Sequence, residues 1–244
     1  MVVQKQYILR RREALKWLDQ PGSLSPVASI YLKAGSQSAE IERSLLSVMD
    51  RGELFDEISA KADGSPAGSV IFCGMERTLL LRPPFPLQVD SVEKGYSPAP
   101  IKSLLEREWC VGLVLVRLGH FAIAVFQGEK LLEYKAGTGL VHARHHKGGS
   151  SANRFARHRE KQMEYFFSRV EGHARDLLES RLHSLDYIIY GGTRETLRAL
   201  WKQCPFFRKL ELKAVPRLLD VREPKFSALA GAIEQAYTTS VHEF

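Results

Sequence analysis

A long helical pattern that begins directly after two glycines constrains the fold of this chain most. Residues 151–183 are helical in pattern throughout, about 33 residues that would span roughly 50 Å at 1.5 Å per residue. Ser151 stands at the N-cap position, where serine is favoured. The apolar stripe of this pattern consists of Phe155, Phe166, Val170, Ala174, Leu177 and Leu178. We therefore expect one long helix at 151–183.

The loop before this helix, 136–150, is basic and carries Gly148 and Gly149 near its end. Glycine lets the backbone approach another molecule without side-chain obstruction, and it reaches positive φ at little cost. The start of a helix leaves several N–H groups unpaired and carries positive dipole charge, so it attracts anions. A tip built in this way suits a crowded RNA end.

Positive charge is concentrated at the same place. The whole chain has a net charge of +7, and between His142 and Arg169 seven Lys/Arg stand against two acidic residues. Arg154, Arg157 and Lys161 fall at i, i+3 and i+7, on one helical face, which favours contact with RNA phosphates over a merely solvated surface. For the other basic run, Arg10-Arg11-Arg12, we expect a solvated surface.

Composition excludes several classes of protein. The chain has 244 residues, enough for one large or two modest domains, and its 44% hydrophobic content is ordinary for a globular protein. No apolar run approaches the roughly 20 residues needed to cross a bilayer, and the N-terminus lacks a secretory pattern, so we expect a cytoplasmic protein. Three distant cysteines, Cys73, Cys110 and Cys204, predict buried thiols without a disulfide partner or a metal site.

The remaining patterns predict an α+β chain. A proline-rich stretch, 83–100, places the domain boundary near 98. Gly191-Gly192-Thr193 is interpreted as a structural turn from strand to helix, in preference to an anion site. Helices are expected at 7–18, 38–62 with Ser38 as N-cap, 101–108, 193–203 and from about 225; strands are expected at 27–33, 68–73, 78–82, 110–118, 121–127, 130–135, 186–190 and 209–215.

From about residue 67 onward the chain resembles the class-1 translation termination factors of eukaryotes and archaea. The loop of that superfamily reads His-Gly-(Arg/Lys)-Gly-Gly-Gln-Ser-Ala-x-Arg-Phe-x-Arg, and residues 145–157 here read His-His-Lys-Gly-Gly-Ser-Ser-Ala-Asn-Arg-Phe-Ala-Arg. The strand meander before the loop and the long helix after it match as well, as does Val-Ile-Phe-Cys-Gly at 70–74. Within the superfamily, the chain is most similar to short bacterial relatives of the Vms-type peptidyl-tRNA hydrolases.

The resemblance implies an N-terminal α/β domain, 1–98, followed by a ribonuclease-H-like middle domain, 99–244. It also implies that the loop enters the peptidyl-transferase centre of the large ribosomal subunit and meets peptidyl-tRNA. Carried over residue by residue, the catalytic positions are Gly148, Gly149, Ser150 and Ser151. The RNA-binding positions are Arg144, His145, His146, Lys147, Arg154, Arg157 and Lys161.

The departures from the family pattern are informative. Termination factors carry glutamine where this chain has Ser150, and Vms-type members carry it where this chain has Ser151. The codon-reading tetrapeptide and the domain that docks a GTPase are also missing, so we expect no reading of stop codons. Backbone N–H groups of the tip can still stabilise the oxyanion of ester hydrolysis, and the serine hydroxyl can hydrogen-bond a water.

The sequence therefore favours a codon-independent rescue factor that hydrolyses peptidyl-tRNA on stalled ribosomes, as a monomer without cofactor, metal or membrane. Two alternatives stay open. One is a Pelota-like factor that binds the ribosome and tRNA without hydrolysis, because the family glutamine is absent. The other is an RNA-binding module that kept the fold and changed its target.

Overall fold

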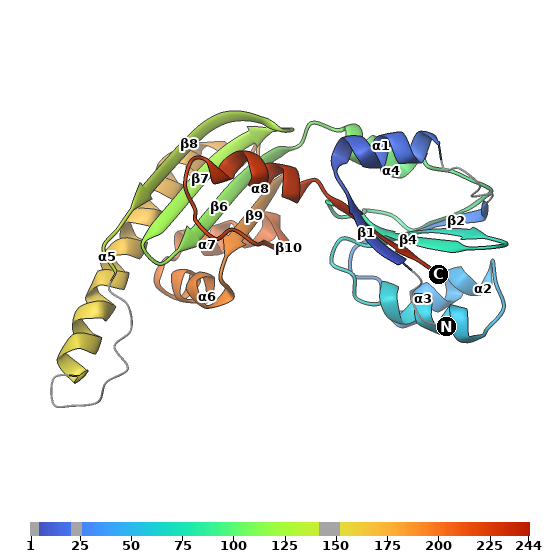
Figure 1. Ribbon diagram of the computed structural model, residues 1–244, viewed down its shortest axis with the longest axis horizontal. Helices are drawn as coiled ribbons and strands as arrows, with labels where there is room; N and C mark the ends of the chain where they lie inside the picture. Colours follow the sequence, from blue (N-terminus) through green and yellow to red (C-terminus); the bar gives the residue numbers. More distant parts are fainter. Residues whose placement is uncertain (1–4, 21–25, 142–151) are drawn as a thin grey trace. The chain divides into compact units, whose positions relative to one another are not determined.

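The computed structural model describes residues 5–20, 26–141 and 152–244, which divide into two compact units (Figure 1). The first unit runs to Arg107 and also includes Glu234–Phe244, and the second is Glu108–Ile233. The division thus falls after Arg107, a few residues beyond the boundary expected near 98, and the chain returns to the first unit after Ile233. Within the described ranges, no helix combines the length and the apolar character needed to cross a membrane.

The first unit is built on a six-stranded sheet. Its strand order is β1 (Lys5–Leu9), β11 (Thr239–Glu243), β4 (Thr78–Arg82), β3 (Ser69–Gly74), β2 (Pro26–Leu32) and β5 (Ser91–Lys94). Every neighbouring pair is antiparallel. The α+β expectation for the chain is confirmed, whereas the narrower expectation of an α/β domain at the N-terminus is wrong, because that class requires parallel strands joined by helices.

Helices cover both faces of this sheet (Figure 1). Successive residues of a strand point to opposite faces, and β3 shows this in full: Val70 and Phe72 pack with α1 (Arg11–Asp19) and α4 (Ala99–Glu106), whereas Ile71 and Cys73 pack with α2 (Ser38–Leu46) and α3 (Glu53–Ala62). A strand buried on both faces reads as a continuous apolar run, as this one does.

Several expectations for the first unit are wrong in detail. Strand β5 was not expected, and α4 begins and ends two residues before its expected bounds, 101–108. Residues 7–9 belong to strand β1, and the first helix begins only at Arg11. Arg10 is the N-cap residue of this helix, and its N–H donates to Glu13 Oε2 at 2.9 Å. The expected helix 38–62 is two helices, separated at residues 47–52. Strand β11 was not expected at all. It lies between β1 and β4, where Val241 pairs with both Tyr7 and Leu81.

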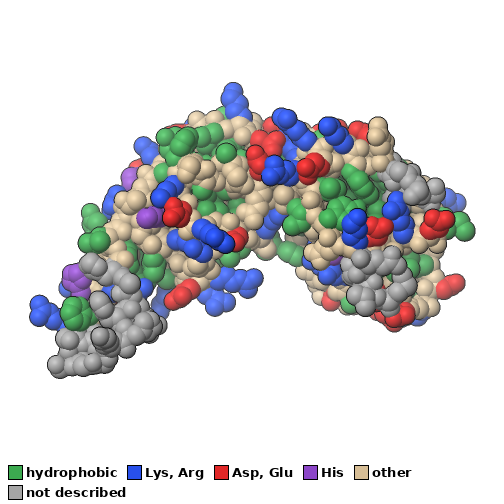
Figure 2. Space-filling view, in the orientation of Figure 1, with side chains coloured by type: hydrophobic (Ala, Val, Ile, Leu, Met, Phe, Trp, Pro, Cys, Tyr) green, Lys and Arg blue, Asp and Glu red, His purple; other side chains and the backbone are tan. Residues whose placement is uncertain are grey.

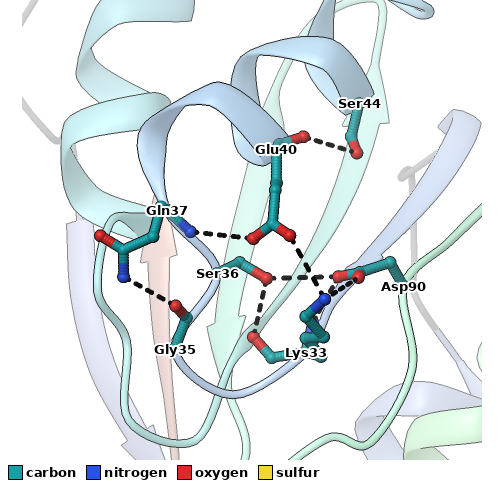
Figure 3. Close-up of polar contacts among 7 residues, drawn as sticks. All are labelled: Lys33, Gly35, Ser36, Gln37, Glu40, Ser44 and Asp90. Atoms are coloured by element: carbon teal, nitrogen blue, oxygen red, sulfur yellow. Dashed lines mark hydrogen bonds and ion pairs between the residues drawn. The ribbon is translucent and has the colours of Figure 1, made fainter.

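A polar network fixes the connection from β2 to α2 (Figure 3). The Lys33 ammonium lies 3.3 Å from Glu40 Oε1 and 3.2 Å from Asp90 Oδ2, and the Lys33 N–H donates to Asp90 Oδ1 at 2.8 Å. Ser36 Oγ also donates to Asp90, at 3.2 Å. The N-cap residue is Gln37, whose N–H donates to Glu40, so the expected cap at Ser38 is one residue too late.

Arg11 is buried, contrary to the solvated surface expected for this basic run. Its Nε donates to the Leu105 carbonyl at 2.6 Å, and its Nη2 donates to the Glu106 carbonyl at 2.9 Å. The guanidinium also lies over the Tyr237 ring, 4.8 Å from its centroid. Because the last carbonyls of a helix lack partners within the helix, Arg11 satisfies the end of α4 and ties it to α1.

We predict that Arg11→Met lowers the free energy of unfolding by roughly 2–3 kcal/mol, because the α4 carbonyls lose a charged hydrogen-bond donor. The matched control is Arg12→Met, which changes an exposed neighbour and should shift stability by less than about 0.5 kcal/mol. Urea unfolding followed by circular dichroism measures both. Equal losses in the two variants would contradict the role given to Arg11.

His242 makes folding depend on pH. Its side chain is buried in β11, and burial, followed by the nearby charges of Lys61 and Arg82, lowers its pKa to about 4. Below about pH 6.5 the unfolded chain binds a proton that the folded chain excludes. We predict that stability falls as the pH drops from about 6.5 to about 4, by on the order of 3 kcal/mol from this group. In His242→Gln this part of the pH dependence of the free energy of unfolding is lost. If the free energy of unfolding of His242→Gln depended on pH as that of the parent does, the assignment to His242 would be contradicted.

The second unit is built on a mixed five-stranded sheet, ordered β10 (Ala214–Leu219), β9 (Tyr187–Gly192), β6 (Cys110–Arg117), β7 (His120–Gln127) and β8 (Lys130–Thr138). Strands β6, β7 and β8 form the expected antiparallel meander, and β9 and β10 run parallel to β6. Helix α5 (Ala152–Leu178) leads from β8 to β9. Helices α6 (Arg194–Gln203) and α7 (Phe206–Lys209) lead from β9 to β10, and α8 (Ala228–Ala236) follows.

Several bounds differ from expectation in this unit: β8 runs to Thr138 and not to 135, and α8 begins at Ala228 and not near 225. The long helix ends at Leu178 and continues as a short 3-10 turn, Glu179–Arg181, so it is shorter than 151–183. The strand expected at 209–215 begins only at Ala214, because residues 206–213 form α7 and a second 3-10 turn. Pro216 within β10 is tolerated because this strand lies at the edge of the sheet.

The turn at Gly191-Gly192-Thr193 is structural, as predicted. Gly192 has a φ of +124°, and a Cβ there would lie 2.0 Å from the Val116 carbonyl oxygen. Thr193 Oγ1 accepts from the Thr196 N–H at 3.2 Å and so caps α6. Glycine is required by both the backbone conformation and the close approach to β6.

Candidate nucleic-acid interface

Most of the predicted site falls on residues 142–151, which lie outside the described residues. These are the four catalytic candidates, Gly148, Gly149, Ser150 and Ser151, and four RNA-binding candidates, Arg144, His145, His146 and Lys147. The described candidates are Arg154, Arg157 and Lys161, all exposed and all on α5. The structure therefore shows the helix that follows the glycine loop.

Helix α5 has two parts with different surroundings. From Phe166 onward its inner face is buried, through Phe166, Phe167, Val170, Ala174, Leu177 and Leu178, in the core of the second unit. Residues 154–165 are exposed or half-buried, and this part of the helix extends beyond the sheet (Figure 1). Phe155, expected in the buried stripe, is 52% exposed, so that part of the expectation is wrong.

The exposed part carries a continuous cationic face. At about 100° per residue, Arg154, Arg157 and Lys161 lie within roughly 60° of one another around the helix. Figure 2 shows Lys, Arg and His side chains together with apolar side chains at this end of α5. The first turn of the helix contains no acidic residue, so its positive dipole adds to the positive side chains.

Two glycines at the end of β8 allow close packing, Gly137 against β7 and Gly139 against α5. A Cβ on Gly139 would lie 2.6 Å from Cδ2 of Phe166, and one on Gly137 would lie 2.8 Å from Cε1 of Phe121. The Gly139 N–H donates to the Gly119 carbonyl at 2.9 Å. Across from it, Arg169 Nη1 donates to the Thr138 carbonyl at 3.0 Å. The chain therefore leaves the sheet at a fixed point beside the helix.

A pocket of about 350 Å³ opens between this point and the helix. Phe166 is its one fully buried residue, and Tyr165 and Leu140 are 69% and 73% exposed. Sequence reasoning did not find this pocket, although a signal was present: Arg154, His158, Lys161, Tyr165 and Arg169 recur every three or four residues and so share one face. The lining consists of Gly139, Leu140, His158, Lys161, Gln162, Tyr165, Phe166 and Arg169.

The cysteines are buried structural thiols, as predicted. Cys73, Cys110 and Cys204 are free and buried, in the cores of the two units. Burial raises the pKa of Cys73 and of Cys204 to about 12, and it also raises that of Cys110. A thiol protonated at neutral pH is a poor nucleophile and a poor metal ligand.

Among the described residues, His, Cys, Asp and Glu form no group of three that could hold an ion. The loop histidines His142, His145 and His146 lie outside those residues.

The strand meander, the glycine-flanked exit from β8 and the projecting basic helix all lie within residues 110–178. A model of the actinobacterial and chloroflexi VLRF1 release factor family, acVLRF1, matches residues 110–242, more than half of the chain. The chain belongs to this family.

The chain is 27% identical to peptide chain release factor subunit 1 of Aeropyrum pernix over 158 residues, which cover 62% of this chain and 40% of that protein. The match thus spans less than half of this relative's length. Among solved structures, archaeal translation termination factor aRF1 is similar with a TM-score of 0.43 and 20% identity, over 94% of this chain and 73% of that one. Pelota of Archaeoglobus fulgidus is similar with a TM-score of 0.32 and 9% identity, over 94% and 61%.

Proposed function

We propose that this protein releases nascent chains from stalled ribosomes by hydrolysing peptidyl-tRNA without reading a codon. The observation that carries the proposal is the exposed cationic part of α5, which follows directly on the Gly148-Gly149 loop in a chain of the VLRF1 family. A rigid helix that extends beyond its own sheet can carry the loop into a narrow site. The strand order of the second unit, an antiparallel meander followed by two parallel strands, supports a ribonuclease-H-like middle domain.

In this proposal Gly148 and Gly149 let the backbone enter the peptidyl-transferase centre of the large subunit. The amides of Ser150 and Ser151 face the ester carbonyl or the attacking water, and stabilise the oxyanion as backbone donors do elsewhere. Arg144, His145, His146 and Lys147 contact RNA beside the tip. Much of the rate enhancement then comes from proximity on the ribosome.

Arg154, Arg157 and Lys161 hold RNA phosphates along the helix, a role supported by their exposure and their shared face. The reaction so described uses only backbone amides, hydroxyls and water, so it needs neither cofactor nor metal. We propose a monomer that acts in the cytoplasm, with the ribosome and peptidyl-tRNA as partners and with neither a membrane nor a disulfide-linked protein among them.

A non-hydrolytic, Pelota-like rescue factor is the second candidate. It is favoured by one observation: serine stands at both positions, 150 and 151, where release-factor relatives carry the catalytic glutamine. Such a protein would occupy the same site and bind the same RNA, but leave the ester intact.

Purified ribosomes stalled with a labelled nascent chain separate these candidates. We predict that the protein releases the chain, and that Gly149→Ala lowers the rate on the order of 100-fold, because the added Cβ obstructs the approach of the backbone to the ester. Ser150→Ala should keep the rate within a few-fold, because the amide rather than the hydroxyl acts. Tight ribosome binding with intact peptidyl-tRNA would favour the Pelota-like candidate. RNA binding without preference for ribosomes would favour a module with another target.

We predict that a double variant, Arg154→Gln with Arg157→Gln, weakens tRNA binding and lowers the slope of log affinity against log salt by about 2, because two phosphate contacts are lost. The matched control is Lys202→Gln with Arg208→Gln, which removes the same charge from exposed positions on α6 and α7. Binding is measured by filter retention between low and moderate salt. Equal effects of the two double variants would show that only net charge matters.

A further inference from the structure

The pocket beside α5 has exposed apolar side chains at its rim. Tyr165 and Leu140 flank it and remain largely exposed, whereas the neighbouring Phe166 and Phe167 are fully buried. Ligand pockets are commonly lined by apolar and aromatic side chains with a few polar groups that fix orientation. The volume, about 350 Å³, lies at the small end of the range for ligand sites, roughly 300–1,000 Å³.

The charge around the pocket selects the kind of ligand. Lys161, Arg169 and His158 line it, and none of its lining residues is acidic. Arg154 stands on the same helical face, two turns before Lys161, so the cationic face of α5 leads into the pocket. A ligand with a flat apolar part and an attached negative charge is complementary to this arrangement.

We propose that this pocket takes one unpaired RNA nucleotide, whose base stacks on the Tyr165 ring and whose phosphate is held by Lys161 and Arg169. Proteins that bind unpaired RNA commonly combine an aromatic ring for the base with cations for the backbone. The proposal rests on the proposed function in one respect, that the helix reaches RNA. It adds a contact to a base at the root of the loop, where phosphate contacts alone were assigned.

The position of the pocket limits which nucleotide it takes. Phe166 and Gly139 are held in contact by the core, so the floor of the pocket is fixed relative to the second unit. Tyr165 lies about four turns along α5 from Ala152, or roughly 20 Å at 1.5 Å per residue. The bound nucleotide therefore lies beside the anchored part of α5, well along the helix from Ala152.

The test measures binding of a fluorescein-labelled single-stranded RNA octamer by anisotropy, with the same strand in a duplex for comparison. Tyr165→Ala is expected to weaken binding to the single strand at least about five-fold, the usual minimum for one stacked base. Tyr165→Phe, which keeps the ring, should stay within about two-fold of the parent. Leu140→Glu, which places an acid at the pocket, should weaken binding as Tyr165→Ala does.

The control is Tyr134→Ala, which removes another half-exposed tyrosine, in β8, away from the pocket lining. It should leave the affinity unchanged. Equal affinity of the parent, Tyr165→Ala and Leu140→Glu for the single strand overturns the proposal. Equal weakening on single strand and duplex overturns it too, because a duplex offers no unpaired base. The assay uses no ribosome, so failure of nascent-chain release leaves its result intact.

Discussion

The packing of the second half of α5 on the meander determines how the rest of the site is placed. Phe166, Phe167 and Val170 are fully buried in the core with residues of β6 and β7, and Gly139 allows the chain to approach Phe166 closely. Because helices in proteins are stabilised mainly by such tertiary contacts, the buried half supports the exposed half that precedes it. A helix anchored at one end presents its exposed part, residues 154–165, away from the core.

This arrangement reconciles two requirements that a single surface could not meet. The anchored half needs apolar side chains, and the projecting half needs cations that tolerate full solvation. The change occurs between Tyr165 and Phe166, where an exposed aromatic residue is followed by a buried one. The pocket lies at this junction, where the floor is rigid and the rim is charged.

Local patterns predicted the second unit well, because its elements are set by contacts close in sequence. The first two strands of the meander 110–138 are continuous apolar runs joined at Gly119, and the stripe from Phe166 onward is periodic. The first unit was predicted less well. Strand β11 pairs with β1 and β4 across more than 150 residues, and the buried role of Arg11 depends on carbonyls at residues 105 and 106. The strands that pair with β11 and the carbonyls that bind Arg11 are too far away in the sequence for a local pattern to predict them. A run of arginines has the same sequence pattern whether it is solvated or caps a distant helix. The expectation that Phe155 is buried was wrong for a related reason. The apolar periodicity of α5 continues beyond the edge of the sheet that buries the rest of the stripe.

The most direct measurement of the central claim is site-directed crosslinking from the exposed part of α5 on stalled ribosomes. A photoreactive amino acid at Arg157 is predicted to crosslink to peptidyl-tRNA or to RNA of the peptidyl-transferase centre, and one at the exposed position Lys202 on α6 is not. Crosslinks from Lys202 alone, or from neither position despite ribosome binding, would contradict the claim that α5 carries the loop to the acylated end of tRNA.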